Sequence, residues 1–214
     1  MKQPLYATLA TYCNSLSAEF EQISDDRKAT LRQLNSYIKG KHITQQSASL
    51  VVICTHNSRR SHLGQVWLQT AAACYGVDKL QTYSGGTEAT AVHPNAVAAL
   101  RHAGFGVQVT GVGPNPVYIV HAGADIPVAS TYSKRYDDAA NPARDFCAIM
   151  VCTDADRDCP IVFGSENRIT LPYDDPKAYD GTSEEAEQYD RCCRRIAREM
   201  FYAMSVGRSH SAIS

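Results

Sequence analysis

The sequence predicts a three-layer α/β protein, with an open parallel sheet of about four strands between helices. Short apolar, β-branched runs alternate with segments of helical period, in the order strand 49–54, helix 61–75, strand 80–83 and helix 94–102. The run at 146–152 is continuously apolar, which is typical of a central strand covered on both faces. This order favours right-handed crossovers, and therefore a parallel sheet.

Length and composition limit the possible functions. The chain has 214 residues, of which 44% are hydrophobic, enough for a substantial core. A net charge of −1 gives no indication of a nucleic-acid or acidic membrane surface as partner. Without a long apolar run or a signal-peptide pattern, the sequence predicts a cytoplasmic protein. Its eight cysteines are too sparse for a secreted disulfide scaffold, so they are expected to serve catalysis, metal binding or the core.

Residues 1–46 form a predicted N-terminal helical extension. Apolar residues recur at helical spacing in two stretches, and Ser24 is placed to cap the second helix. The stripe in the first stretch consists of Leu5, Leu9, Cys13, Leu16 and Phe20. It could pack back on the main domain or meet the same stripe in a second subunit, as a homodimer, and both possibilities remain open.

Residues 47–207 form the predicted main domain. The first helix is expected to stop at Gly76, and a short fourth strand to cover 168–171. Thr182 and Glu185 match a capping box for a last helix that reaches about Val206. The proline-rich segment 111–145 interrupts the alternation and is predicted as a hairpin-like insert. The tail 208–214 is expected to be disordered.

The first strand ends in a pattern that fits an oxyanion cradle with a thiol in it. Cys54 is separated by five residues from Arg60, between a β-branched strand and a helix. A tight loop there can direct backbone N–H groups at one anion, and the helix N-terminus adds its positive end. Arg60 supplies a planar fork for two oxygens, and the field favours thiolate over thiol at Cys54. The predicted oxyanion-binding loop is Thr55, His56, Asn57, Ser58, Arg59, Arg60 and Ser61.

The same spacing occurs a second time, which provides an internal control. Cys192 and Arg198 also have five residues between them, but they lie inside a predicted helix. Helical amides are already engaged in backbone hydrogen bonds, so this pair cannot form a cradle. Cys192 and its neighbour Cys193 are therefore expected to be core and flank residues.

The strand order predicts a second thiol near the first. The alternation suggests a flavodoxin-like sheet of order 2-1-3-4, in which ligands bind beyond the carboxyl ends of the first and third strands. Cys54 ends the first strand and Cys152 ends the third. Both should open onto one crevice, although almost a hundred residues separate them.

Three motifs together resemble a known superfamily. Cys54 to Ser61 is similar to the signature loop of low-molecular-weight protein tyrosine phosphatases. The segment Cys152 to Pro160 resembles the redox segment of thioredoxin-coupled arsenate reductases built on that fold. The pair Asp175-Pro176 resembles the Asp-Pro acid motif of the superfamily, and the likeness extends over about residues 49–205 without the insert.

The resemblance implies an arsenate reductase. Cys54 would attack arsenate, Asp175 would protonate the departing oxygen, and Cys152 followed by Cys159 would form a disulfide relay. No tightly bound cofactor and no metal are expected. An external thiol reductant of the thioredoxin type would regenerate the enzyme.

Several alternatives remain open at this stage. A low-molecular-weight phosphatase would use Cys54, Arg60 and Asp175 to hydrolyse phosphomonoesters, including phosphotyrosine protein. A non-catalytic oxyanion or redox sensor would bind without turnover. A half zinc site at Cys152 and Cys159 is disfavoured, because six intervening residues exceed the usual two to four. The chain also departs from the superfamily pattern, with His56 in the place of a glycine and Arg59 where the reductases often have cysteine.

Overall fold

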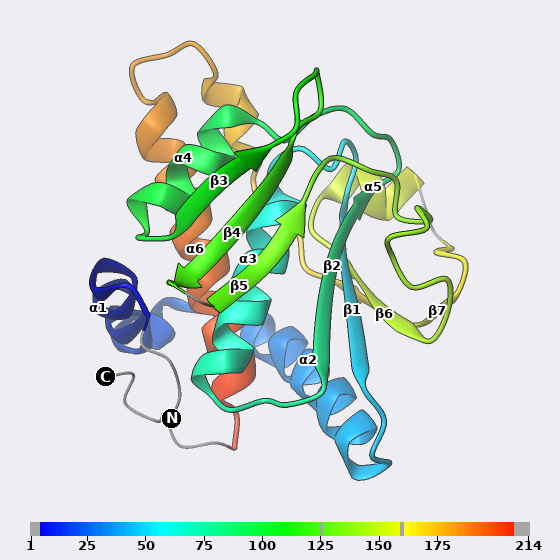
Figure 1. The fold of residues 1–214 in the computed structure, drawn as a ribbon. Coiled ribbons are helices and arrows are strands. Elements are labelled where there is room, and N and C mark those ends of the chain that lie inside the picture. The colour runs from blue at the N-terminus through cyan, green and yellow to red at the C-terminus, as the bar shows by residue number, and fades with distance from the viewer. Residues whose placement is uncertain (1–4, 125, 159–160, 208–214) are drawn as a thin grey trace.

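The computed structural model of the chain describes residues 5–124, 126–158 and 161–207. Four strands form a parallel sheet in the order β2-β1-β6-β7, which confirms the predicted order (Figure 1). Their bounds are β1 Ala48–Cys54, β2 Leu80–Gly86, β6 Phe146–Met150 and β7 Ser165–Thr170. The expected tail 208–214 lies outside the described residues.

The register of the sheet determines what meets at its carboxyl edge. Cys54 is paired with Gly86 of β2, and Ile53 with Met150 of β6. The next residue, Val151, still donates its N–H to Ile53 O over 2.9 Å. Cys152, just after the end of β6, therefore lies at the same carboxyl edge of the sheet as Cys54, the last residue of β1.

Helices cover one face of this sheet, whereas mostly irregular chain covers the other. α3 (Arg60–Cys74), α6 (Glu185–Ser205) and α2 (Asp25–Ile43) lie on one side in Figure 1, and the short helix α5 (Thr153–Asp158) lies on the other. Every residue of β6 is buried, as the continuous apolar run predicts for a strand covered on both faces. α4 (Pro94–His102) packs against α6 and α3.

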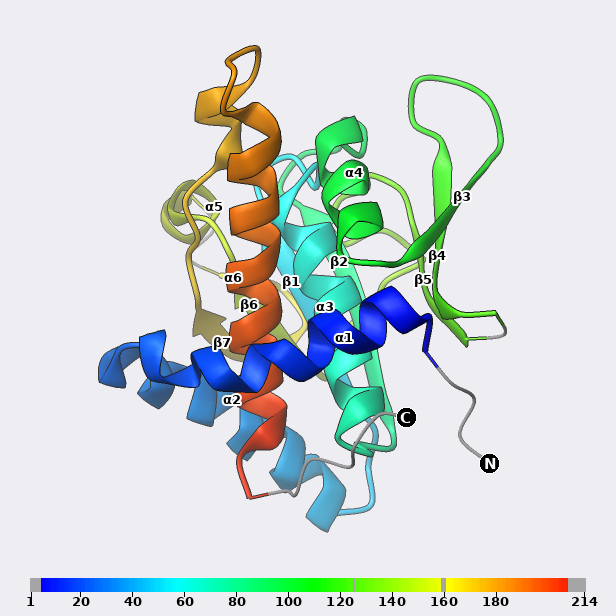
Figure 2. The same cartoon turned by 90° about the vertical axis from the view of Figure 1, so that its left-hand side faces the viewer.

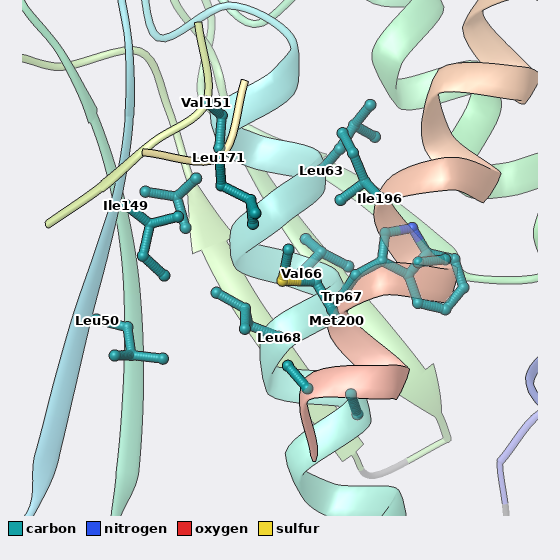
Figure 3. Packing of buried hydrophobic residues seen from close by; sticks show 14 of the residues in the cluster. Leu50, Leu63, Val66, Trp67, Leu68, Ile149, Val151, Leu171, Ile196 and Met200 are labelled. Carbon is teal, nitrogen blue, oxygen red and sulfur yellow. The ribbon is translucent and has the colours of Figure 1, made fainter. Parts of the chain in front are cut away.

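The core lies between the sheet, α3 and α6. Figure 3 shows Val66 and Leu68 of α3 between apolar residues of the strands and Met200 of α6, with the Trp67 indole farther from the strands. Leu63, Val66, Trp67 and Leu68 are fully buried, as are Ile196 and Met200 across the interface. This packing fixes α3, and with it the loop that precedes α3.

The N-terminal extension packs against its own chain. It consists of α1 (Ala7–Leu16), a 3-10 turn η1 (Ser17–Gln22) and α2, and Figure 2 shows α1 crossing α6 and α3. Leu9, Cys13 and Leu16 are fully buried, and the Tyr12 ring stacks on Trp67 at 5.3 Å. Of the two arrangements that the sequence allowed for this stripe, the structure has the fold-back. Ser24 caps α2, as expected, by accepting from Arg27 N.

The insert and the strand that precedes it form an antiparallel sheet of order β3-β4-β5, with bounds β3 Gly106–Thr110, β4 Val117–Gly123 and β5 Ile126–Thr131. The hairpin of β4 and β5 fits the expectation for residues 111–145. Strand β3 was not predicted, because its exposed, alternating residues carry little apolar signal.

One local expectation was wrong, and one short helix was not foreseen. The first turn of α6 is preceded by Glu184 as N-cap, so Thr182 and Glu185 do not form a capping box. Thr182 Oγ1 instead accepts from Glu184 N over 3.3 Å in a turn one step earlier. The helix α5 was not foreseen in the acidic segment after Cys152. No helix in the described part of the chain is long and apolar enough to span a membrane.

Candidate active site

Cys54 lies at the base of a loop between β1 and α3. It is 4% exposed, and its sulfur lies 3.1 Å from Ser61 Oγ. Asn57 Nδ2 donates to the same Ser61 oxygen over 2.8 Å. Because that contact uses a lone pair of the hydroxyl oxygen, the hydroxyl proton is free to point at the sulfur, which stabilises a thiolate.

The loop has the backbone of an anion site. Asn57 and Ser58 are buried, and Asn57 adopts a positive φ of 43°. Among the described residues, no acceptor is found for the backbone N–H groups of residues 56–59. Buried amides rarely remain without an acceptor, so these donors fit an oxyanion above Cys54.

Residues that the sequence did not single out support the loop from below. His62 Nε2 lies 2.7 Å from Asn57 O, so this nitrogen carries the proton and donates. Its Nδ1 accepts from the hydroxyls of Ser84 and Thr131. Burial and the nearby charge of Lys134 lower the pKa of His62 to about 3, which keeps the ring neutral. No sequence signal marks His62, because its partners are 22 and 69 residues away.

The chain after β5 supports the loop from the side. Ser133 Oγ donates to His56 O over 2.9 Å, and Lys134 N donates to Asn57 Oδ1 over 2.9 Å. The predicted insert is therefore part of the structure that holds the cradle. The side chain of His56 points elsewhere, with Nε2 3.6 Å from Glu88 Oε2 and nearly half of the side chain exposed.

Gly86 allows β2 to approach the loop closely. A Cβ at this position would lie 2.3 Å from Glu88 O, 2.6 Å from Thr55 O and 2.8 Å from Asn57 N. All three atoms belong to the backbone, which cannot move away without displacing the cradle. A glycine is therefore required at this position by space.

Arg60 and Asp175 meet directly over the cradle. Arg60 Nη1 donates to Tyr173 O over 2.7 Å, and Nη2 forms an ion pair with Asp175 Oδ2. The other carboxylate oxygen accepts from Lys177 N over 3.1 Å, so Asp175 also caps the 3-10 turn η2 (Pro176–Tyr179). The cavity between Cys54, Arg60 and Asp175 measures only about 10 Å³. An oxyanion bound by the planar fork of Arg60 needs the donor that Asp175 occupies, so Asp175 has to separate from Arg60 before such an anion binds.

Asp174, the neighbouring acid, points away from the cradle. Its side chain is fully exposed and pairs with Arg195 Nη1 at 3.2 Å. It borders a groove of about 620 Å³ between α6 and the N-terminal extension, whereas Asp175 borders both this groove and the cradle. Of the two carboxylates, Asp175 alone has the position expected of an acid.

Arg59 connects the cradle to the segment after Asp175. Its Nε donates to Tyr189 Oη over 2.6 Å and its Nη2 to Asp180 Oδ2 over 2.8 Å. Tyr189 Oη donates in turn to Asp180 Oδ1 over 2.7 Å, so each of the three residues is hydrogen-bonded to the other two. The His93 ring stacks on the Tyr189 ring at a centroid distance of 5.3 Å, and the backbone N–H of His93 donates to Ser58 O over 2.9 Å. The sequence indicated Arg59 as a loop residue but gave no sign of these partners.

The second predicted thiol lies beside the first loop residue. Cys152 Sγ is 3.2 Å from Thr55 Oγ1 and accepts from Ala155 N over 3.2 Å, and the residue is buried. The predicted partner Cys159 falls outside the described residues. Among the cysteines that are described, all are free thiols.

The control pair behaves as expected of helix residues. Cys192 and Arg198 both lie within α6. Burial raises the pKa of Cys192 to about 12, and also that of Cys193, whose sulfur accepts from Trp67 Nε1 over 3.2 Å. In the described part of the chain, no group of three or more His, Cys, Asp or Glu side chains is placed to hold a metal ion.

No family model matches the sequence. An arsenate reductase from Bacillus subtilis is 30% identical over 134 residues, which cover 62% of this chain and 77% of that protein. "Arsenate reductase 2" from Staphylococcus epidermidis is 27% identical over 128 residues, or 60% of this chain and 78% of the relative. The fold is similar to the crystal structure of a YwlE mutant from Bacillus subtilis, with a TM-score of 0.51 at 15% identity, covering 75% of this chain and 98% of that one. The chain belongs to the arsenate reductase family.

Proposed function

We propose that this protein reduces arsenate to arsenite, beginning with nucleophilic attack by Cys54. The thiolate attacks arsenic, and one arsenate oxygen leaves as water after taking a proton from Asp175. The product is a thioester-like bond between Cys54 sulfur and arsenic(V). The loop amides and the Arg60 fork stabilise the negative charge of the remaining oxygens during this step.

The reduction itself needs a second thiol. Cys152 thiolate attacks Cys54 sulfur, the new S–S bond forms, and the electron pair of the S–As bond stays on arsenic, which leaves as arsenite. Cys159 thiolate then attacks Cys152 sulfur and releases Cys54 as thiolate. An external dithiol protein of the thioredoxin type reduces the resulting Cys152–Cys159 disulfide. The enzyme requires no tightly bound cofactor, and we expect it to work in the cytoplasm.

One observation supports this proposal more than any other, namely the 3.2 Å contact between Cys152 Sγ and Thr55 Oγ1. Thr55 directly follows the nucleophile, so the contact brings the second thiol to the border of the cradle. Phosphate ester hydrolysis has no use for a thiol in that position, whereas reduction depends on it.

The order of the two later thiols provides the test. After one turnover with arsenate, a Cys159→Ser variant should accumulate a Cys54–Cys152 disulfide, detected by peptide mapping with mass spectrometry. A Cys152→Ser variant should release no arsenite at all. Cys192→Ser serves as the matched control, since that thiol lies partly buried on α6 and outside the cradle, and it should reduce arsenate like the wild type. If the wild type forms no disulfide in the presence of arsenate, the proposal is wrong.

A phosphatase activity is the second candidate, and the pairing of Arg60 with Asp175 favours it. These two residues and Cys54 are sufficient for hydrolysis through a cysteinyl-phosphate. Comparison of phosphotyrosine hydrolysis with arsenate reduction by the same preparation decides between the two. Efficient hydrolysis without any disulfide would favour the phosphatase, and stoichiometric oxyanion binding without product would indicate a sensor.

A further inference from the structure

Two adjacent arginines of the cradle hold the two ends of one short segment. Arg60 pairs with Asp175 at its start, and Arg59 pairs with Asp180 at its end, over 2.8 Å. Between these ends lies the 3-10 turn Pro176–Tyr179, whose last turn places Asp180 as C-cap. The acid segment is thus attached to the loop at two points that are only one residue apart in the loop.

Binding of an oxyanion removes one of the two attachments. The cavity above Cys54 measures about 10 Å³ while Asp175 occupies the guanidinium of Arg60. An oxyanion takes both donor positions of that fork, so the carboxylate has to move out. Asp175 would then be held only by its chain neighbours, although proton transfer requires it within about 3 Å of the leaving oxygen.

The second attachment does not compete with the oxyanion. Arg59 uses its Nε and Nη2 on Tyr189 and Asp180, and its side chain is 12% exposed. Burial alone would raise the pKa of Asp180, but the hydrogen bond from Tyr189 and the charge of Arg59 lower it, so Asp180 remains an anion. The stacked ring of His93 fixes Tyr189, and the His93 N–H holds the loop at Ser58.

We propose that Arg59, Asp180 and Tyr189 form a tether that keeps Asp175 beside the leaving oxygen after the oxyanion has displaced it from Arg60. The three are positioning residues, since they act on the reaction through Asp175. This inference deepens the proposed function, because it rests on Asp175 as the acid of the same site.

The dependence of hydrolysis on the leaving group tests the tether. Aryl phosphates with basic phenols as leaving groups need a proton in the transition state, whereas those with acidic phenols leave without one. In Asp180→Asn and Tyr189→Phe, kcat for phenyl phosphate should fall about tenfold or more, and kcat for 2,4-dinitrophenyl phosphate should stay within about twofold of the wild type. KM should not rise. Asp180→Glu, which keeps the charge, should recover most of the loss.

A matched control separates the tether from general damage to α6. Asp190 follows Tyr189 in the helix and pairs with His102 at 3.0 Å on the surface, so Asp190→Asn should leave both esters unaffected. An equal loss for both esters in Asp180→Asn would mean misfolding of the cradle, and no loss would mean that Asp175 needs no tether. Either result overturns the proposal.

A second measurement does not depend on turnover. With inorganic phosphate bound, amide hydrogen exchange of residues 177–180 should remain slow in the wild type and become faster in Asp180→Asn. Equal protection in the two proteins would contradict the tether. Neither measurement uses Cys152 or Cys159. The tether can therefore be confirmed even if the protein does not reduce arsenate, and arsenate reduction can be confirmed even if the tether is absent.

Discussion

The chain contains two cysteine–arginine pairs with the same spacing, and the structure surrounds them very differently. Cys54 and Arg60 stand on either side of a strand–helix junction, whereas Cys192 and Arg198 lie less than two turns apart within α6. Arg60 faces the loop above Cys54. Arg198 Nη1 instead contacts Gln22 of the N-terminal extension.

The difference lies in the backbone more than in the side chains. Around Cys54, the N–H groups of residues 56–59 have no acceptor among the described residues, so they are available to an anion. In the middle of α6, the corresponding groups are engaged in helical hydrogen bonds. A spacing of five residues therefore indicates an oxyanion site only where secondary structure leaves the intervening amides available.

The largest effect is expected at the two cysteines themselves. Cys54→Ser should lower turnover of arsenate and of aryl phosphates by about 10⁴-fold or more, because the nucleophile is lost. Cys192→Ser should change either rate by less than about twofold. Steady-state kinetics on both variants measures this. Comparable losses in the two would show that the junction has no special role.

The next effect concerns the two adjacent acids. Asp175→Asn should lower kcat by about 10²–10⁴, the usual contribution of a general acid. Oxyanion binding should stay equal or become tighter, because the variant no longer competes for Arg60. Asp174→Asn should have almost no effect, since that side chain is fully exposed. Phosphate inhibition constants and kcat, measured together, would reveal a reversed order of the two acids.

The two arginines should differ as well. Arg60→Lys keeps the charge but loses the planar fork, so kcat should fall by about 10²–10³ and phosphate should bind more weakly. Arg198→Lys should leave kcat unchanged and affect stability only slightly, through Gln22 and Glu19. Isothermal titration with phosphate provides the check. Equal phosphate affinity in wild type and Arg60→Lys would show that the planar guanidinium of Arg60 does not bind the anion.

The smallest effect concerns His62, which supports the Cys54 loop, and it appears in the pH dependence of stability. His62 holds the Cys54 loop as a neutral ring with a pKa of about 3, whereas the unfolded chain titrates near the usual value of about 6.5. The unfolded state therefore binds more protons below that value, and His62 contributes a loss of about 2 kcal/mol of stability between pH 7 and 5. Urea unfolding should show a smaller loss over this interval in His62→Gln. An identical pH dependence in both proteins would mean that His62 titrates in the folded state as it does in the unfolded chain.

The parts of the molecule that follow from local pattern could be predicted from the sequence. The continuous apolar run of β6 and the strand–helix junction at Cys54 each depend on neighbouring residues only. Right-handed crossovers then fix the strand order, so the position of Cys152 at the same edge of the sheet as the Cys54 loop could be inferred across almost a hundred residues.

The contacts that support the cradle could not be predicted in the same way. Arg59 meets Asp180 and Tyr189 from 121 and 130 residues away, and no periodicity relates them. Strand β3 was missed because an exposed edge strand carries little apolar signal. The prediction of a capping box at Thr182 was wrong because the Thr182 hydroxyl accepts from the N–H of Glu184, in a turn before the helix, and not from the N–H of Glu185.

Trp67 provides a consequence of a different kind. It is the single tryptophan of the chain, it is fully buried, and the Tyr12 ring of the N-terminal extension stacks on it. Excitation at wavelengths where tyrosine does not absorb therefore yields emission from one indole, and one neighbour of that indole belongs to α1. Detachment of α1 would expose the indole to water and shift its emission to the red, whereas events confined to the cradle would leave the wavelength unchanged. The extension thus carries a built-in optical label for its own attachment.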